Sequence, residues 1–220
     1  MDYLPEKNEK NILVKVKEGE ISALLTSSPK ARGIVIFAHG SGSSRFSPRN
    51  KLVSKYLNEY NFSTLLVDLL TPKEEIEDEV TARLRFDIPL LSHRLTLVAN
   101  WVLNEKETKH LPIGYFGAST GAAAALISAQ ELRTKIKAVV SRGGRPDLAN
   151  KFLAEVVSPT LLIVGGQDPV VLKLNMEAYD MLKCKKKLEV ISGATHLFEE
   201  PGKLEEVAKL SVQWFIKYLK

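Results

Sequence analysis

The sequence predicts an α/β protein: a three-layer α/β/α sandwich built on a mostly parallel sheet of eight strands. From residue 33 onward, short apolar runs rich in β-branched residues alternate with segments of helical period. Hydrophobic residues make up 45% and charged residues 26% of the chain, as is usual for a globular protein. With 220 residues and no repeat or long flexible linker, we expect a single domain over 1–220.

The first elements are predicted from local pattern. Residues 11–16 and 21–26 are short, alternating and close together, which indicates an antiparallel hairpin. Residues 33–40 (GIVIFAHG) form a continuous apolar run, as a strand covered on both faces would. Ser47 and Pro48 then provide the N-cap and the first residue of a helix.

The remaining elements repeat this alternation, which predicts parallel strands joined by right-handed crossovers. Pro89 is expected at the start of its helix or at a kink within it. The predicted strands cover 62–70, 111–117, 136–143, 159–166 and 186–193, and the predicted helices cover 47–61, 81–105, 119–132, 147–156, 171–183 and 202–220. Because ligands bind at the carboxyl ends of such strands, we look for function in the loops that follow them.

Composition argues against nucleic-acid partners and against a membrane or secreted location. The net charge of +5 comes from scattered lysines without zinc-ligand or RNA-binding patterns, so no nucleic-acid partner is expected. No apolar run approaches the ~20 residues of a membrane span, and the polar start MDYLPEKNEK lacks the core of a signal peptide. The single cysteine, Cys184, excludes an internal disulfide and is read as a chance thiol. We therefore expect a cytoplasmic protein.

A serine between two glycines is the strongest chemical signal. Gly117, Ser119 and Gly121 fit G-x-S-x-G between an apolar strand and an alanine-rich helix. In that context the glycines allow a tight turn that projects the hydroxyl above the sheet. The alternative is a glycine-rich strand-to-helix turn that the serine merely caps.

A serine nucleophile needs a base, and His196 is the best candidate. It follows the last predicted strand, at the same end of the sheet as Ser119, although it could also be a capping or surface histidine. His110 precedes a strand and His93 lies inside a helix, so both are less suitable.

A carboxylate should orient the imidazole. Asp168 follows the seventh strand, beside the histidine loop, and gives the chain order Ser, Asp, His. Asp68, at the end of the fourth strand, and Asp147, after the sixth, are alternatives, but we interpret Asp68 as a loop anchor and Asp147 as a helix N-cap.

The loop after the third strand supplies the remaining part of a hydrolytic site. Its His39-Gly40 start favours an oxyanion hole formed by the backbone N–H groups of Ser41 and Thr120. The glycine- and serine-rich segment lacks the spacing of a nucleotide-binding loop.

These motifs resemble those of the α/β-hydrolase superfamily over nearly the whole chain, and most closely its small dienelactone-hydrolase-like group. The resemblance rests on FAHGSGSSRFSPRN, LLVDLLT, GYFGASTGAAAAL, VVSRGGRPDLA and LIVGGQDPVV with GATHLFEEPG. It implies the α/β-hydrolase fold and cleavage of carboxylic esters through an acyl-enzyme. The chain departs from dienelactone hydrolases proper, which have a cysteine where this chain has Ser119, and this favours a general serine esterase.

Two further expectations concern the binding site. The segment between the sixth and seventh strands is too short for a cap domain, which predicts an open and shallow site. Arg142, Arg45 and Arg145 all fall at the functional edge, where they could bind an acidic substrate or brace loops. We give substrate binding and loop bracing equal weight, and we regard Arg142 as the best candidate for binding the substrate.

The sequence thus favours a serine hydrolase that cleaves a small ester or thioester, whose substrate is anionic if the arginines bind it. No metal or organic cofactor is expected. An acyltransferase or peptidase with the same triad remains open, as does a binding module with an idle triad. The long amphipathic final helix suits either a monomer or a homodimer.

Overall fold

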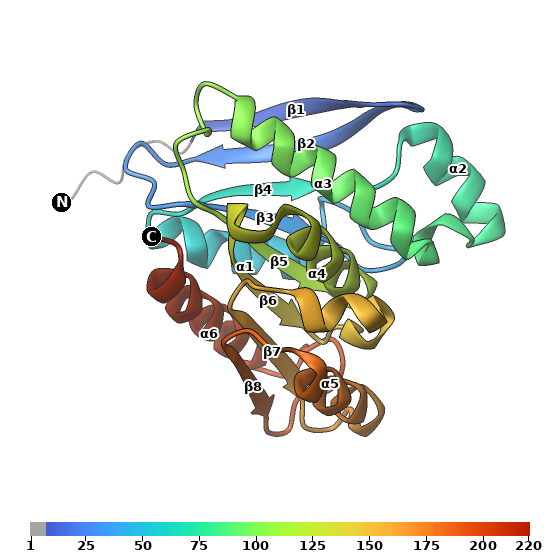
Figure 1. Ribbon diagram of the computed structural model, residues 1–220, viewed down its shortest axis with the longest axis vertical. Helices are drawn as coiled ribbons and strands as arrows, with labels where there is room; N and C mark the ends of the chain where they lie inside the picture. The colour runs from blue at the N-terminus through green and yellow to red at the C-terminus, as the bar shows by residue number, and fades with distance from the viewer. Residues whose placement is uncertain (1–7) are drawn as a thin grey trace.

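The computed structural model describes residues 8–220, and its ribbon is drawn in Figure 1. Eight strands form one sheet in the order β1-β2-β4-β3-β5-β6-β7-β8, which confirms the predicted number. Their bounds are β1 Asn8–Val16, β2 Gly19–Ser27, β3 Ile34–Ala38, β4 Ser63–Val67, β5 Ile113–Ala118, β6 Ile136–Arg142, β7 Thr160–Gly165 and β8 Lys186–Ile191.

The sheet is mostly parallel, as predicted. β1 and β2 form the expected antiparallel hairpin, and β2 pairs antiparallel with β4. All remaining neighbours, from β4 through β3 to β8, are parallel. The carboxyl ends of these strands therefore meet at one edge, where the candidate site residues were expected.

Helices cover both faces of the sheet and complete the three layers (Figure 1). The front layer in this view holds α3, α4, the 3₁₀ segment η3 and α5, while α1 and α6 lie behind the sheet. These elements span α1 Pro48–Glu59, α3 Ile88–Asn104, α4 Thr120–Leu132, η3 Pro146–Glu155, α5 Pro169–Met181 and α6 Lys203–Tyr218. Within residues 8–220, no helix combines the length and the hydrophobicity needed to cross a bilayer.

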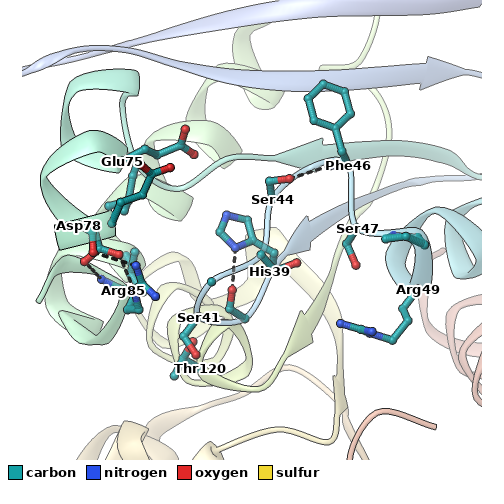
Figure 2. A pocket seen from close by; sticks show the side chains of 17 residues that line it. His39, Ser41, Ser44, Phe46, Ser47, Arg49, Glu75, Asp78, Arg85 and Thr120 are labelled. Carbon is teal, nitrogen blue, oxygen red and sulfur yellow. Dashed lines mark hydrogen bonds and ion pairs between the residues drawn. The ribbon is translucent and has the colours of Figure 1, made fainter. Parts of the chain in front are cut away.

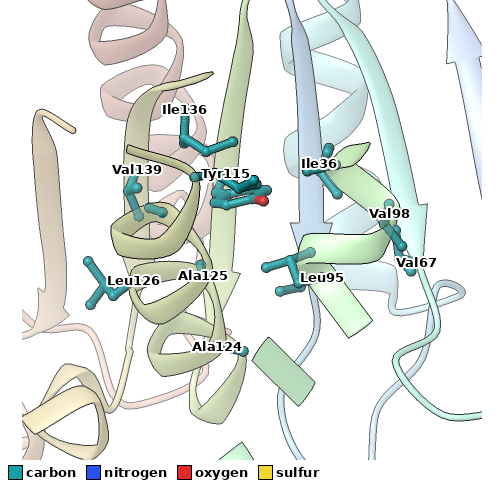
Figure 3. Packing of buried hydrophobic residues seen from close by; sticks show 14 of the residues in the cluster. Ile36, Val67, Leu95, Val98, Tyr115, Ala124, Ala125, Leu126, Ile136 and Val139 are labelled. Carbon is teal, nitrogen blue, oxygen red and sulfur yellow. The ribbon is translucent and has the colours of Figure 1, made fainter. Parts of the chain in front are cut away.

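Two apolar cores lie between the layers, because successive side chains of a strand point to opposite faces. Ile36 and Tyr115 belong to the core under α3 and α4, which Figure 3 shows from close by. Phe37 and Phe116 belong to the core under α1 and α6, where their ring centroids are 4.8 Å apart. With apolar side chains on both faces, the central strands read as continuous hydrophobic runs in the sequence.

Two elements differ from the sequence prediction. Helix α2, Pro72–Thr81, was not predicted, although Thr71 and Glu74 form a capping box at its start. The regular helix predicted over 147–156 is wrong: η3 is 3₁₀ helix interrupted at Asn150, whose φ is 41°. Asparagine tolerates positive φ better than most residues, which allows this break.

Two further expectations, on Pro89 and on a cap domain, agree with the structure. Pro89 is the second residue of α3, so it marks the start of that helix and not a kink. Only η3 and its flanking loops join β6 to β7, which confirms the absence of a cap domain at that position. The polar segment at residues 1–10, in which we expected no signal-peptide core, falls mainly in residues 1–7, outside the described residues.

Candidate active site

Ser119 occupies a strained turn between β5 and α4. Its φ of 49° and ψ of −122° are unfavourable for a residue with a side chain, and such strain is maintained only when the surroundings enforce it. The Ser119 N–H donates to the carbonyl of Arg142 at 3.4 Å, and the Ser119 carbonyl accepts from Arg145 N–H at 3.0 Å. The loop after β6 therefore fixes the backbone of the candidate nucleophile.

The glycines of the motif are required by close packing around this turn. A Cβ atom at Gly117 would lie 2.5 Å from the Cα atom of Ala122. A Cβ atom at Gly121 would overlap the carbonyl oxygens of Ala38 and His39. The start of α4 thus packs directly against the end of β3, and no side chain fits at either position.

Asp168 and His196 are hydrogen-bonded to each other. Nδ1 of His196 lies 2.7 Å from Oδ2 of Asp168. Because an ionised carboxylate only accepts, this contact assigns the proton to Nδ1 and leaves Nε2 free to accept. The other carboxylate oxygen of Asp168 accepts from the N–H of Val171 at the start of α5, which fixes the aspartate side chain.

The loops after β7 and β8 bring this pair together. A Cβ atom at Gly165 would overlap the carbonyl of Ala194, and the N–H of Gln167 donates to that same carbonyl at 2.9 Å. Asp168 and His196 therefore meet because their two loops are in backbone contact. This is the neighbouring-loop arrangement that favoured Asp168 over the other acids.

The loop after β6 connects this pair to Ser119. Arg142 binds the Ser119 N–H through its carbonyl, and a Cβ atom on the next residue, Gly143, would lie 3.7 Å from Cε1 of His196. The side chains of Ser119 and His196 form no hydrogen bond in the described residues. Catalytic hydrogen bonds are often long without substrate and tighten when it binds.

A cavity of about 660 Å³ opens beside the nucleophile turn. Ser41 and Thr120 both line it, and Figure 2 labels them together with His39 above them. Thr120 is the first residue of α4, where an N–H has no acceptor within the helix. The two residues expected to form the oxyanion hole thus lie at a solvent-filled space next to Ser119.

This cavity has a wall that the sequence analysis did not anticipate. Its far wall is formed by α2, which contributes Glu75, Asp78 and Glu79 (Figure 2). Asp78 accepts hydrogen bonds from Arg85 Nε at 2.5 Å and from the N–H of Leu84 at 2.6 Å. These bonds tie the end of α2 to the segment that follows it. Burial, together with the Asp68 carboxylate, raises the pKa of Glu75.

Two of the three candidate arginines are paired with carboxylates. Arg45 forms an ion pair with the buried Asp68, whose other oxygen accepts from the Arg45 N–H at 2.6 Å. Arg145 binds both oxygens of Asp147, at 2.9 and 2.8 Å. This geometry fits the bracing role and makes Asp68 a loop anchor. The N-cap role expected for Asp147 is wrong, because its carboxylate is bound to Arg145.

Arg142 differs from both. Its side chain points from β6 towards α1, and its Nη2 atom donates to Oδ1 of Asn50 at 3.3 Å. No carboxylate lies within 4.0 Å of it in residues 8–220. Burial, with a further contribution from the neighbouring Arg49, lowers the pKa of Arg142 to about 10, so it stays charged at neutral pH.

Sequence reasoning missed the residues around Arg142 and the α2 wall. Asn50 and Arg49 lie in the first turn of α1 and had only the helix-start signal of Ser47-Pro48. The α2 wall could have been found from the T-x-x-E capping box at Thr71. The other histidines lie elsewhere: His93 is exposed on α3, and His110 is exposed ahead of β5.

The order of the strands, the strained serine turn and the Asp–His pair at the carboxyl edge define an α/β-hydrolase fold. The sequence model of the dienelactone hydrolase family matches residues 21–219, so the chain belongs to that family.

Similar proteins of known structure support this assignment. A dienelactone hydrolase from Anabaena variabilis is 50% identical, with a TM-score of 0.96 and coverage of 97% of this chain and 99% of its own. Est1E from Butyrivibrio proteoclasticus is only 16% identical, but its TM-score of 0.79 over 94% of this chain and 98% of its own shows the same fold.

Two curated relatives come from Mycobacterium tuberculosis strains and carry the name "Putative phosphoribosyl transferase". Each is 53% identical over 215 residues, which is 98% of this chain but 48% of the relative. The chain therefore spans about half the length of the curated relatives it matches.

Proposed function

We propose that the chain is a serine hydrolase that cleaves a small carboxylic ester or thioester through an acyl-enzyme. The observation that carries the proposal is the 2.7 Å contact between His196 Nδ1 and Asp168 Oδ2, on the sheet edge that also holds Ser119. Membership of a family of hydrolases supports the same reading. No metal or organic cofactor is invoked in this mechanism.

Each residue has a distinct role in the proposed reaction. Nε2 of His196 takes the proton from Ser119 as its oxygen attacks the carbonyl, and Asp168 stabilises the imidazolium that forms. The N–H groups of Ser41 and Thr120 donate to the oxyanion, a contribution typically worth ~3 kcal/mol for each donor. His196 then protonates the leaving group and activates water, which releases the acid.

The cavity favours short or polar acyl groups. Polar side chains outnumber apolar ones in its lining, to which Phe46, Leu70 and Leu91 contribute apolar surface. A long alkyl chain placed there would remove water from carboxylates and hydroxyls without replacing their hydrogen bonds. We therefore expect acetate and butyrate esters to be cleaved faster than octanoate esters.

The test is a series of p-nitrophenyl esters, from acetate to octanoate, with the wild type and Ser119→Ala. We expect the variant to lose roughly a thousandfold or more in kcat, as removal of a triad member usually does. Labelling by a fluorophosphonate probe separates an active site from an idle one, because only an activated serine reacts. Absence of both turnover and labelling would leave a binding module as the better interpretation.

The name of the mycobacterial relatives suggests a different activity, which we assign to their other half. The matched 215 residues make up 48% of each relative, and the match over 21–219 is to a hydrolase family. A phosphoribosyl transferase activity in those proteins is thus best sought in the half that this chain does not match. Assaying this chain for ester hydrolysis and for phosphoribosyl transfer tests this assignment, which expects the first activity and not the second.

A further inference from the structure

A buried cation without a counter-ion lies beside the candidate nucleophile. Arg142 is 6% exposed, and within residues 8–220 its Nε atom has no hydrogen-bond partner. Among these residues its guanidinium makes one hydrogen bond, 3.3 Å long, to the neutral amide of Asn50. A buried charge is stable only when it is paired, and leaving one unpaired is strongly destabilising.

A second arginine shares this environment. Arg49 lies close enough to Arg142 to oppose its charge, and its own buried Nε atom is also without a partner in the part of the chain that the structure describes. Its Nη1 atom binds Glu199 at 2.9 Å, but that carboxylate is 61% exposed and weakly held. Among the described residues, the two guanidinium groups therefore have one solvated carboxylate between them, bound to Arg49 only, which leaves a net positive charge.

The first turn of α1 adds to this charge. Arg49 and Asn50 are residues of that turn, next to the N-cap Ser47. The amino end of a helix carries a partial positive charge that favours anions. The Arg142 guanidinium contacts Asn50 in this turn from β6, so the amino end of α1 lies beside it.

We propose that Arg142, Arg49 and the first turn of α1 form a binding site for an oxyanion group, a carboxylate or a phosphate. The bound anion supplies the counter-ion that Arg142 lacks and accepts from guanidinium N–H groups of Arg142 and Arg49. Guanidinium groups bind such planar or tetrahedral oxyanions through paired hydrogen bonds.

The location links this site to the proposed reaction. The carbonyl of Arg142 holds the Ser119 N–H, and Arg49 lines the same cavity as Ser41 and Thr120. An acyl or alcohol group that carries an anion could therefore reach Arg49 while its ester lies at Ser119. This substrate role rests on the proposed function, whereas binding of a free anion does not.

The first experiment measures binding of inorganic phosphate by calorimetry at constant ionic strength, with chloride as the reference. Ser119→Ala is used as the parent so that catalysis plays no part. We expect Arg142→Gln and Arg49→Gln each to weaken phosphate binding roughly tenfold to a hundredfold, the range for loss of a charge-assisted hydrogen bond. The matched control is Arg32→Gln, because Arg32 is exposed before β3, at the opposite sheet edge.

The second experiment identifies the source of the anion. It compares kcat/KM for p-nitrophenyl hydrogen succinate and its neutral isostere, p-nitrophenyl isocaproate. If the substrate carries the anion, Arg142→Gln lowers the succinate-to-isocaproate ratio at least tenfold; if the ratio is unchanged while phosphate binding is lost, the site holds a free anion.

Two results would overturn the proposal. One is a parent protein that binds phosphate no better than chloride, and the other is phosphate binding that survives both arginine substitutions. Should Arg142→Gln fail to fold, Arg49→Gln decides the matter, because the Arg49 side chain is 30% exposed and tolerant of change. Failure of all ester turnover would refute the proposed hydrolase and leave the phosphate experiment valid.

Discussion

Gly40 lies against Ser119 so closely that a Cβ atom added to the glycine would be 2.9 Å from the serine Cβ atom. The same added atom would lie 3.2 Å from the carbonyl of Ala118. The loop after β3 and the nucleophile turn are therefore in direct backbone contact. Ser41, the proposed oxyanion donor, follows Gly40 directly, so we expect the spacing between this loop and Ser119 to control catalysis.

Gly40→Ala should reduce activity more than stability. The new methyl group must push the loop away from Ser119, and a displacement of about 1 Å in a catalytic group costs roughly a hundredfold in rate. Overpacking of this kind costs about 1–3 kcal/mol in unfolding free energy. The measurements are kcat/KM on a short ester and urea unfolding of the same samples.

Gly42→Ala is the matched control in the same loop. Gly42 has a φ of 66°, so alanine there is strained, but the nearest atom to its Cβ would be Arg85 Nη1 at 3.6 Å. It should lose about 1–2 kcal/mol of stability with a much smaller loss in kcat/KM. Equal losses of activity in both variants would mean that loop strain, and not contact with Ser119, matters.

Ser119→Gly should stabilise the protein while removing its activity. A side chain at a φ of 49° and a ψ of −122° stores about 1–3 kcal/mol of strain, which glycine relieves. Part of that gain is offset because glycine makes the unfolded chain more flexible. We expect a net gain of up to about 2 kcal/mol by urea unfolding, together with complete loss of ester turnover.

Arg133 offers a control with nearly the same backbone. Its φ of 50° and ψ of −123° match those of Ser119, but it is exposed at the end of α4, remote from the site. Arg133→Gly should gain similar stability and keep full activity. If Ser119→Gly were no more stable than the wild type while Arg133→Gly gained, the strain at Ser119 would be balanced by contacts of its hydroxyl.

The two paired arginines should differ sharply in their contribution to stability. Arg45 neutralises Asp68, which is 4% exposed, so Arg45→Ala leaves a buried carboxylate unpaired and should cost about 3–5 kcal/mol. The Arg145–Asp147 pair is more exposed, and Arg145→Ala should cost less than about 1 kcal/mol. Unfolding free energies of the two variants test this contrast, which would fail if their losses were equal.

The sequence alone was sufficient to predict site residues that lie in the loops after the parallel strands. Ser119, Asp168 and His196 could be placed together because parallel strands bring all their carboxyl ends to one edge, independently of side-chain detail. The eight strands were recognisable because the central ones are apolar on both faces.

What could not be predicted depends on contacts between distant residues. Whether Arg142 or Arg45 has a carboxylate partner is decided by α1 and by the end of β4, which no local pattern relates to them. The break at Asn150 also has no periodic signature, because tertiary packing overrides the helical pattern of 147–156. The wall that α2 adds to the cavity likewise follows from where α2 packs.

His39 should make the stability of the loop after β3 depend on pH. Its Nδ1 atom lies 2.9 Å from the carbonyl of Gly40, and its Nε2 atom lies 3.3 Å from the N–H of Leu69. A carbonyl only accepts and an N–H only donates, so the neutral ring with its proton on Nδ1 is required. Burial lowers the pKa of His39, against an opposing effect of the Gly40 carbonyl and Asp68.

The direction of the effect follows from this lowered pKa. As pH falls below about 6.5, the usual histidine value, the unfolded chain binds a proton that the folded chain resists, so stability decreases. The contribution of one such site cannot exceed about 1.4 kcal/mol per pH unit. His39→Gln should therefore lose less stability than the wild type between pH 7 and 5 in urea unfolding.

His93→Gln, which removes an exposed imidazole from α3, provides the control. Parallel curves for the wild type and His39→Gln would show that the loop tolerates a protonated ring.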